Sequence, residues 1–152
     1  MKSSHLRKPV FIDLFAGAGG LSIGLEQAGF ELIAATDWDY WSCETLRSNH
    51  PGILVKEGDI TEIDLNVFSK EIGGVEVDLI AGGPPCQGFS QLGKRQKDDA
   101  RNQLWRQYMK FVAHFTPKIF LIEKEADGRQ VRRMVGRAQG RGCYAQTAST
   151  KA

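Results

Sequence analysis

The sequence predicts an α/β protein with a doubly wound, mostly parallel sheet. Short apolar runs of strand length alternate with stretches of helix length along most of the 152 residues. This alternation is typical of βαβ units, which build parallel sheets with helices packed on their faces. The residues with the least common chemistry stand where the predicted strands end, and folds of this kind bind ligands at that edge of the sheet.

Five strands are expected, at residues 10–15, 32–35, 53–55, 77–81 and 118–122. Helices are expected over 21–28, 40–49 and 102–115, with one more short helix between 61 and 75. Gly29 and Pro51 mark the ends of the first two helices. Four apolar residues of the helix over 102–115 recur at helical spacing and predict one buried face: Leu104, Tyr108, Phe111 and Phe115.

Charge and apolar content divide the chain at residue 123. Residues 1–123 carry a net charge of −3 and residues 124–152 a net charge of +5, within an overall charge of +2. No Leu, Ile, Phe or Trp follows Ile122. The expected organisation is an N-terminal extension over 1–9, a folded body over 10–123 and a basic, weakly ordered tail over 124–152.

Composition also restricts where the protein works. No apolar run approaches the length of a membrane span, and the polar N-terminus has no signal-peptide core. The three cysteines lack the paired spacing of a metal site. We therefore expect a cytoplasmic protein with free thiols, no membrane partner and no metal.

The end of the first predicted strand has the features of a cofactor loop. Glycines at 17, 19 and 20 allow a sharp turn and a close approach of the backbone to a ligand. The dinucleotide pattern is incomplete, because Ser22 stands where a further glycine is required. A tight turn without a ligand would explain this loop taken alone.

Two further strand ends strengthen the cofactor interpretation. Asp37, at the end of the second strand, suits ribose hydroxyls, and Trp38 beside it suits an adenine face. Asp59 and Ile60 follow the third strand, where a carboxylate can accept from an adenine amino group. The absence of phosphate-specific features favours S-adenosylmethionine over NAD as the cofactor.

The fourth strand end carries a candidate nucleophile. Pro84 and Pro85 restrict the backbone before Cys86, and glycines lie on both sides of this stretch. A thiol becomes an effective nucleophile when its pKa falls below about 8.5. Cys43 and Cys143 lack such a context and are expected to be ordinary thiols.

Together, DLFAGAGG at residues 13–20 and GPPCQGFS at residues 83–90 strongly resemble the DNA (cytosine-5)-methyltransferase family, over roughly residues 9–123. The resemblance implies that Cys86 is the catalytic nucleophile. It also implies that Glu123 is the proton donor near N3 of the cytosine base. It further implies a set of residues that hold S-adenosylmethionine: Phe15, Gly17, Gly19, Gly20, Leu21, Asp37, Trp38, Asp59, Ile60, Pro85 and Leu104.

The resemblance also implies that double-stranded DNA is the substrate. Attack by the Cys86 thiolate at C6 of cytosine activates C5 toward the methyl donor, and the base must leave the duplex to be reached. The residues expected to contact DNA are Ser90, Lys94, Arg95, Lys97 and Arg101. Family members that act on tRNA usually have Thr in place of Ser90, which favours DNA over the tRNA alternative.

The family pattern stops after Glu123. Members normally read ENV there, whereas Lys124 follows Glu123 in this chain, and the later family blocks are missing. We therefore expect an N-terminal, truncated portion of such an enzyme, with a sheet that ends at an unpaired fifth strand and little activity by itself. The sequence leaves three alternatives open. A second chain could supply the missing part of the enzyme, the protein could be a binding module without catalysis, or it could be an NAD-type oxidoreductase.

Overall fold

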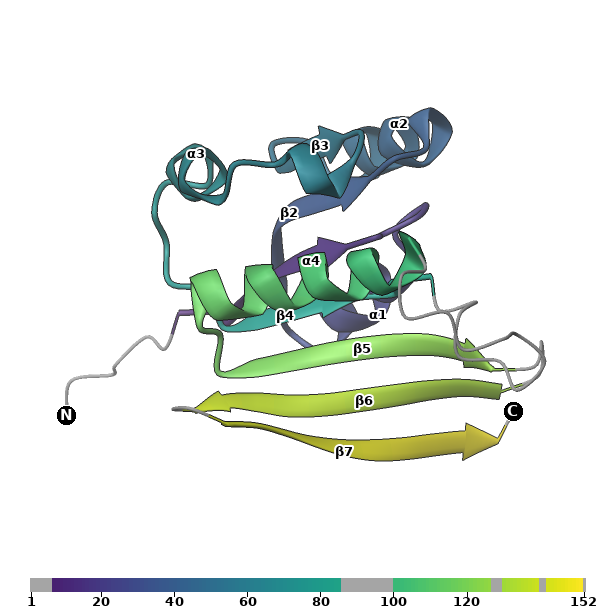
Figure 1. The fold of residues 1–152 in the computed structure, drawn as a ribbon. Helices are drawn as coiled ribbons and strands as arrows, with labels where there is room; N and C mark the ends of the chain where they lie inside the picture. The colour runs from purple at the N-terminus through teal and green to yellow at the C-terminus, as the bar shows by residue number, and fades with distance from the viewer. Residues whose placement is uncertain (1–6, 86–99, 127–129, 140–141, 152) are drawn as a thin grey trace, which may run out of the picture.

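The computed structural model describes residues 7–85, 100–126, 130–139 and 142–151, built around one seven-stranded sheet (Figure 1). The strands lie in the order β3-β2-β1-β4-β5-β6-β7. Neighbours from β3 to β5 are parallel, whereas β6 and β7 are antiparallel. Their bounds are β1 Val10–Leu14, β2 Glu31–Asp37, β3 Leu54–Glu57, β4 Leu79–Gly82, β5 Ile119–Ala126, β6 Gln130–Gln139 and β7 Gly142–Lys151. The predicted α/β class with a mostly parallel sheet is confirmed.

The helices connect the parallel strands. They are α1 (Gly20–Gln27), α2 (Tyr40–Asn49), α3 (Leu65–Glu71) and α4 (Ala100–Phe115), with a 3₁₀ turn η1 (Ile60–Glu62) before α3. The bounds expected for the helix over 40–49 are those of α2. That helix starts at residue 40 because the Asp39 side chain accepts a hydrogen bond from the Ser42 N–H over 2.8 Å, as a helix-capping residue does.

Alternating strand side chains form a core on each face of the sheet. Ile12, Ile80 and Ile122 belong to the core that includes α3 and α4. Phe11 and Leu79 belong to the opposite core, against which Leu21 and Leu25 of α1 pack. In Figure 1, α4 lies in front of the sheet and α1 behind it. The predicted buried face of α4 is confirmed, since Tyr108 and Phe111 belong to the first core and Leu104 and Phe115 pack against it.

The prediction that the sheet ends at an unpaired fifth strand is wrong. The strand β5 pairs with β6 through seven residue pairs, from Phe120↔Gly136 to Ala126↔Gln130, and β6 pairs in turn with β7. Low apolar content gave the wrong expectation because a hairpin can add to an existing edge through backbone hydrogen bonds with little burial. Accordingly, the Val135 and Arg137 side chains of β6 are exposed.

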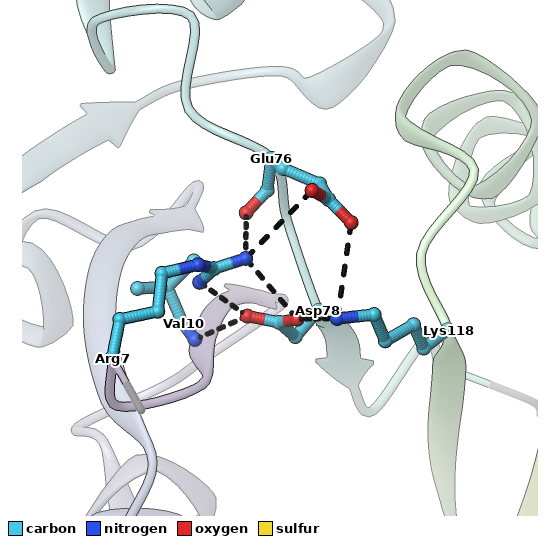
Figure 2. Close-up of polar contacts among 5 residues, drawn as sticks. All are labelled: Arg7, Val10, Glu76, Asp78 and Lys118. Atoms are coloured by element: carbon cyan, nitrogen blue, oxygen red, sulfur yellow. Dashed lines mark hydrogen bonds and ion pairs between the residues drawn. The ribbon is translucent and has the colours of Figure 1, made fainter. Parts of the chain in front are cut away.

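A buried carboxylate joins three segments where β4 begins (Figure 2). Asp78 Oδ2 accepts from Arg7 Nη1 over 2.6 Å and from the Val10 N–H over 2.9 Å, and Oδ1 accepts from Lys118 Nζ over 2.7 Å. Glu76 adds longer ion pairs to both cations. Burial by itself raises the pKa of Asp78, but the hydrogen bonds from Lys118, Val10 and Arg7 outweigh it and hold the pKa below its usual value.

Replacing Asp78 with alanine is expected to lower the free energy of unfolding by about 2–3 kcal/mol, because three donors lose a charged acceptor. The folded-state pKa is depressed, so this stabilisation is fully present above the unfolded-state pKa of about 4 and is lost as the pH falls through the folded value. Urea denaturation from pH 7 to pH 3 measures both effects. The exposed Glu76→Ala variant is the control and should stay near wild type; a loss as large as that of Asp78→Ala would contradict the assignment.

Candidate active site

A pocket of about 560 Å³ opens at the carboxyl ends of the parallel strands. It lies beyond β1 to β4, where each chain segment leaves the sheet, and α4 contributes one further wall residue. Ten of the described residues line it: Phe15, Thr36, Asp37, Trp38, Gly58, Asp59, Ile60, Gly83, Pro85 and Leu104. The pocket therefore occupies the edge of the sheet that the sequence predicted for a ligand.

Asp37 ties the glycine loop to the second strand. Its Oδ2 accepts from the Gly17 N–H over 2.7 Å and its Oδ1 from the Asp39 N–H over 2.9 Å. The loop can meet this carboxylate because Phe15 and Gly17 adopt left-handed backbone conformations, with φ of 59° and 54°. The carboxylate thus holds the loop in shape, and each oxygen retains a lone pair for a ligand hydroxyl.

A second carboxyl, that of Asp13, lies fully buried beneath the loop. Its Oδ2 accepts from Ser22 Oγ over 2.6 Å, whereas Oδ1 has no hydrogen-bond partner in the described part of the chain. Burial is the main cause that raises the pKa of Asp13 to about 7, and the charges of Glu123 and Asp37 add to the increase. A titratable group therefore lies next to the pocket without lining it.

Glu123 lies half-buried in β5, near the point where β4 ends. Gly82 and Ile122 are partners in the parallel ladder, and a Cβ placed on Gly83 would lie 3.6 Å from the Glu123 backbone oxygen. Since Glu123 also acts on the pKa of Asp13, its carboxylate belongs to the same acidic neighbourhood. The structure therefore brings Glu123 close to the glycines that precede Cys86 in the sequence.

The charged groups on the pocket wall are acidic. Asp37 and Asp59 are the charged residues among the ten that line it, and no lysine or arginine is among them. A hydrogen bond from the Thr61 N–H, which spans 2.8 Å, lowers the pKa of the exposed Asp59 carboxyl. A wall of this charge suits a ligand that is cationic or rich in hydroxyl and amino groups, and disfavours a phosphorylated one.

Seven of the eleven residues predicted to hold a cofactor line this pocket: Phe15, Asp37, Trp38, Asp59, Ile60, Pro85 and Leu104. The other four, Gly17, Gly19, Gly20 and Leu21, form the adjacent loop and the start of α1. Cys86 and the predicted DNA contacts Ser90, Lys94, Arg95 and Lys97 lie outside the described residues. Arg101 belongs to the first turn of α4, and its side chain also lies outside the described part.

Three lining residues were missed by the sequence reasoning. Thr36 resembles any buried strand residue, so nothing marked it. Gly58 precedes Asp59 at a φ of 120°, and its N–H donates to the Asp37 backbone oxygen over 2.9 Å. A glycine directly before an acidic residue at a strand end was the available signal for Gly58. Gly83 was named only as part of the stretch before Cys86.

No helix in the described part of the chain is long and apolar enough to cross a membrane. Likewise, no group of three or more His, Cys, Asp or Glu side chains within the described ranges is arranged to hold a metal ion.

Comparisons with known proteins identify the family to which a chain with this fold belongs. The model of the C-5 cytosine-specific DNA methylase family matches residues 10–133. The chain belongs to this family. The match extends past residue 123, the expected end of the folded body, into β6.

Individual relatives agree. Type II methyltransferase M.AgeI of Thalassovita gelatinovora is 41% identical over 93% of this chain and 35% of its own length. Type II methyltransferase M.XorII of Xanthomonas oryzae pv. oryzae is 46% identical over 78% of this chain and 28% of its own length. A prophage-encoded E. coli protein, described as a DNA modification methyltransferase, superposes with a TM-score of 0.66 at 36% identity, over 76% of this chain and 32% of its own. The chain thus spans about a third of the length of these relatives.

Proposed function

We propose that this chain binds S-adenosylmethionine in the pocket and serves the transfer of its methyl group to C5 of cytosine in double-stranded DNA. The observation that carries the proposal is the pocket wall, which combines Asp37, Trp38 and Asp59 at successive strand ends and has no basic residue among the described residues that line it. Family membership supplies the reaction class. Names of relatives as type II methyltransferases support a role in restriction-modification, and we propose a cytoplasmic location.

The residues present fit this cofactor. Asp37 can accept from ribose hydroxyls while it keeps its bonds to the loop, and Trp38 offers an aromatic face beside it. Asp59 offers a carboxylate to an amino group, and Ile60, Leu104 and Phe15 supply apolar contact. When bound, the cofactor supplies an electrophilic methyl group on a positively charged sulfur, and the acidic wall suits that charge.

Cys86 is the proposed nucleophile. Its thiolate forms a bond to C6 of cytosine, and the displaced electron pair makes C5 nucleophilic toward the methyl donor. After the methyl group is bound, C5 loses its proton and the Cys86 sulfur leaves with restoration of the ring double bond. Pro84 and Pro85 limit the backbone freedom before Cys86, and Pro85 lies on the pocket wall, so the nucleophile follows the cofactor site directly in the chain.

Glu123 is the proposed proton donor and hydrogen-bond partner at N3 of the base. Charge develops on the ring when the thiolate adds to C6, and a carboxyl near N3 stabilises it. The Glu123 carboxylate lies close enough to the pocket floor to act electrostatically on Asp13. Ser90, Lys94, Arg95, Lys97 and Arg101 remain the proposed contacts to DNA phosphates.

Replacing Trp38 with alanine is expected to weaken S-adenosylmethionine binding about tenfold, because stacking of a base on an aromatic ring contributes about 1–3 kcal/mol. The melting temperature should not change, since the Trp38 side chain is 84% exposed. Calorimetric titration of the 152-residue chain measures the affinity. Trp41→Ala is the matched control, because Trp41 is also exposed and lies outside the pocket lining. Equal losses in the two variants would contradict the role of Trp38.

Transfer of labelled methyl groups to DNA tests the reaction itself. The 152-residue chain, which spans about a third of its relatives, is expected to bind the cofactor and to transfer little methyl to DNA by itself. Robust transfer that disappears in Cys86→Ser would overturn the expected low activity and support the nucleophile. Transfer retained in Cys86→Ala would overturn the nucleophile assignment. Failure to bind S-adenosylmethionine at all would overturn the proposed function.

A further inference from the structure

Asp13 combines features that the methyl-transfer chemistry does not use. It lies in the interior strand β1, fully buried, where Oδ2 accepts from Ser22 Oγ over 2.6 Å and Oδ1 has no hydrogen-bond partner in the described residues. Ser22 belongs to the first turn of α1, directly after the glycine loop. A carboxyl group in this place therefore connects the strand beneath the pocket to the helix that follows the loop.

The charged neighbours of Asp13 come from several elements. Asp37 of β2 and Glu123 of β5 lie close enough for their negative charges to act on it, and Tyr108 of α4 is also electrostatically coupled to it. The Tyr108 hydroxyl donates to the backbone oxygens of Ile80 and Leu121, over 2.8 and 3.0 Å. Among these described neighbours no cation faces Asp13, so the hydrogen bonding from Ser22 is what favours the ionised form, and burial outweighs it.

We propose that Asp13 is a positioning residue that releases its proton when a cation enters the pocket above it, so that binding of S-adenosylmethionine by this chain is linked to proton release. The inference rests on the proposed function, because the cation is the sulfonium of the cofactor. The proton passes from the Asp13 carboxyl to solvent, and the carboxylate that remains keeps its hydrogen bond from Ser22. Positive charge near a buried carboxyl favours ionisation.

The size of the effect follows from the pKa of about 7. At pH 7 the group is about half protonated in the free protein, so at most about half a proton leaves per cofactor bound. The number should fall toward zero well above neutrality, where Asp13 is already ionised. S-Adenosylhomocysteine lacks the sulfonium charge but has the same α-amino group, so the difference between the two ligands cancels the titration of that amino group.

Calorimetric titrations with both ligands, in buffers of different ionisation enthalpy from pH 5 to pH 9, count the protons. We expect S-adenosylmethionine to release up to about half a proton more than S-adenosylhomocysteine near pH 7, and the excess to vanish in Asp13→Asn, which keeps the size of the side chain and an acceptor for Ser22. His50→Gln is the control for a further ionisable side chain against the loop, since the His50 Nε2 would lie 3.7 Å from a Cβ at Gly19, and the excess should persist in this variant.

Each other outcome decides against the inference. The proton linkage is overturned if both ligands bind with equal proton release. It is also overturned if the extra proton release with S-adenosylmethionine persists in Asp13→Asn. Both results leave the proposed function standing. If the extra proton release disappears in His50→Gln and remains in Asp13→Asn, His50 is the source of the proton and the inference is wrong. If Asp13→Asn does not fold, the wild-type profile decides, and an excess that stays constant from pH 5 to pH 9 overturns the linkage. Absence of S-adenosylmethionine binding overturns the proposed function, and the linkage with it.

Discussion

The Gly82→Ala variant is expected not to fold stably, with a loss of more than about 3 kcal/mol in the free energy of unfolding. A Cβ at this position would lie 2.2 Å from the Leu14 backbone oxygen, well inside van der Waals contact. Leu14 belongs to β1, which is held between β2 and β4 by parallel ladders on both sides. The colliding atom is therefore backbone at the centre of the sheet and cannot move aside as a side chain can.

The adjacent Gly83→Ala variant is the matched control. Its Cβ would meet the Glu123 backbone oxygen at 3.6 Å, which is ordinary contact, and the variant should keep its stability within about 1 kcal/mol. Circular dichroism and urea denaturation of both variants measure the difference. Equal stability of the two variants would show that the β1–β4 spacing at Leu14 and Gly82 is not the one described.

The sequence predicted the pocket because parallel strands place their carboxyl ends at one edge. Asp37, Asp59 and Pro85 are far apart in the chain, yet each follows a strand that was recognisable from its apolar run. The prediction that these three residues lie together at one edge of the sheet is therefore confirmed by the pocket that they line. Their roles in cofactor binding stay predictions until the binding experiments are done.

The sequence did not predict residues whose importance depends on where the fold places them and not on their residue type. Thr36 and Asp13 differ from ordinary strand and loop residues only in how the sheet buries them. The hairpin of β6 and β7 escaped for a related reason, because its position depends on pairing with β5, a long-range contact that composition does not encode. Local patterns located the elements, and the packing between elements determined which polar groups became buried.

The second large effect is expected at Asp37. Asp37→Asn should weaken S-adenosylmethionine binding about 100-fold although the two side chains have the same shape. Both carboxylate oxygens accept backbone N–H groups, from Gly17 and from Asp39, and an amide can accept at only one of its two ends. One N–H would face an NH₂ group, so the glycine loop loses a charged hydrogen bond of about 1.5–3 kcal/mol and the ligand loses an anionic acceptor.

The neighbouring Asp39→Asn variant separates this effect from a general loss of acidic charge. The Asp39 side chain is exposed and accepts from Ser42 N–H at the start of α2, a role that asparagine fills equally well. Calorimetric titration should therefore give nearly wild-type affinity for Asp39→Asn and the large loss for Asp37→Asn. Wild-type affinity in Asp37→Asn would refute the role of the carboxylate. Equal losses in the two variants would show that net charge, not the paired backbone acceptors, determines binding.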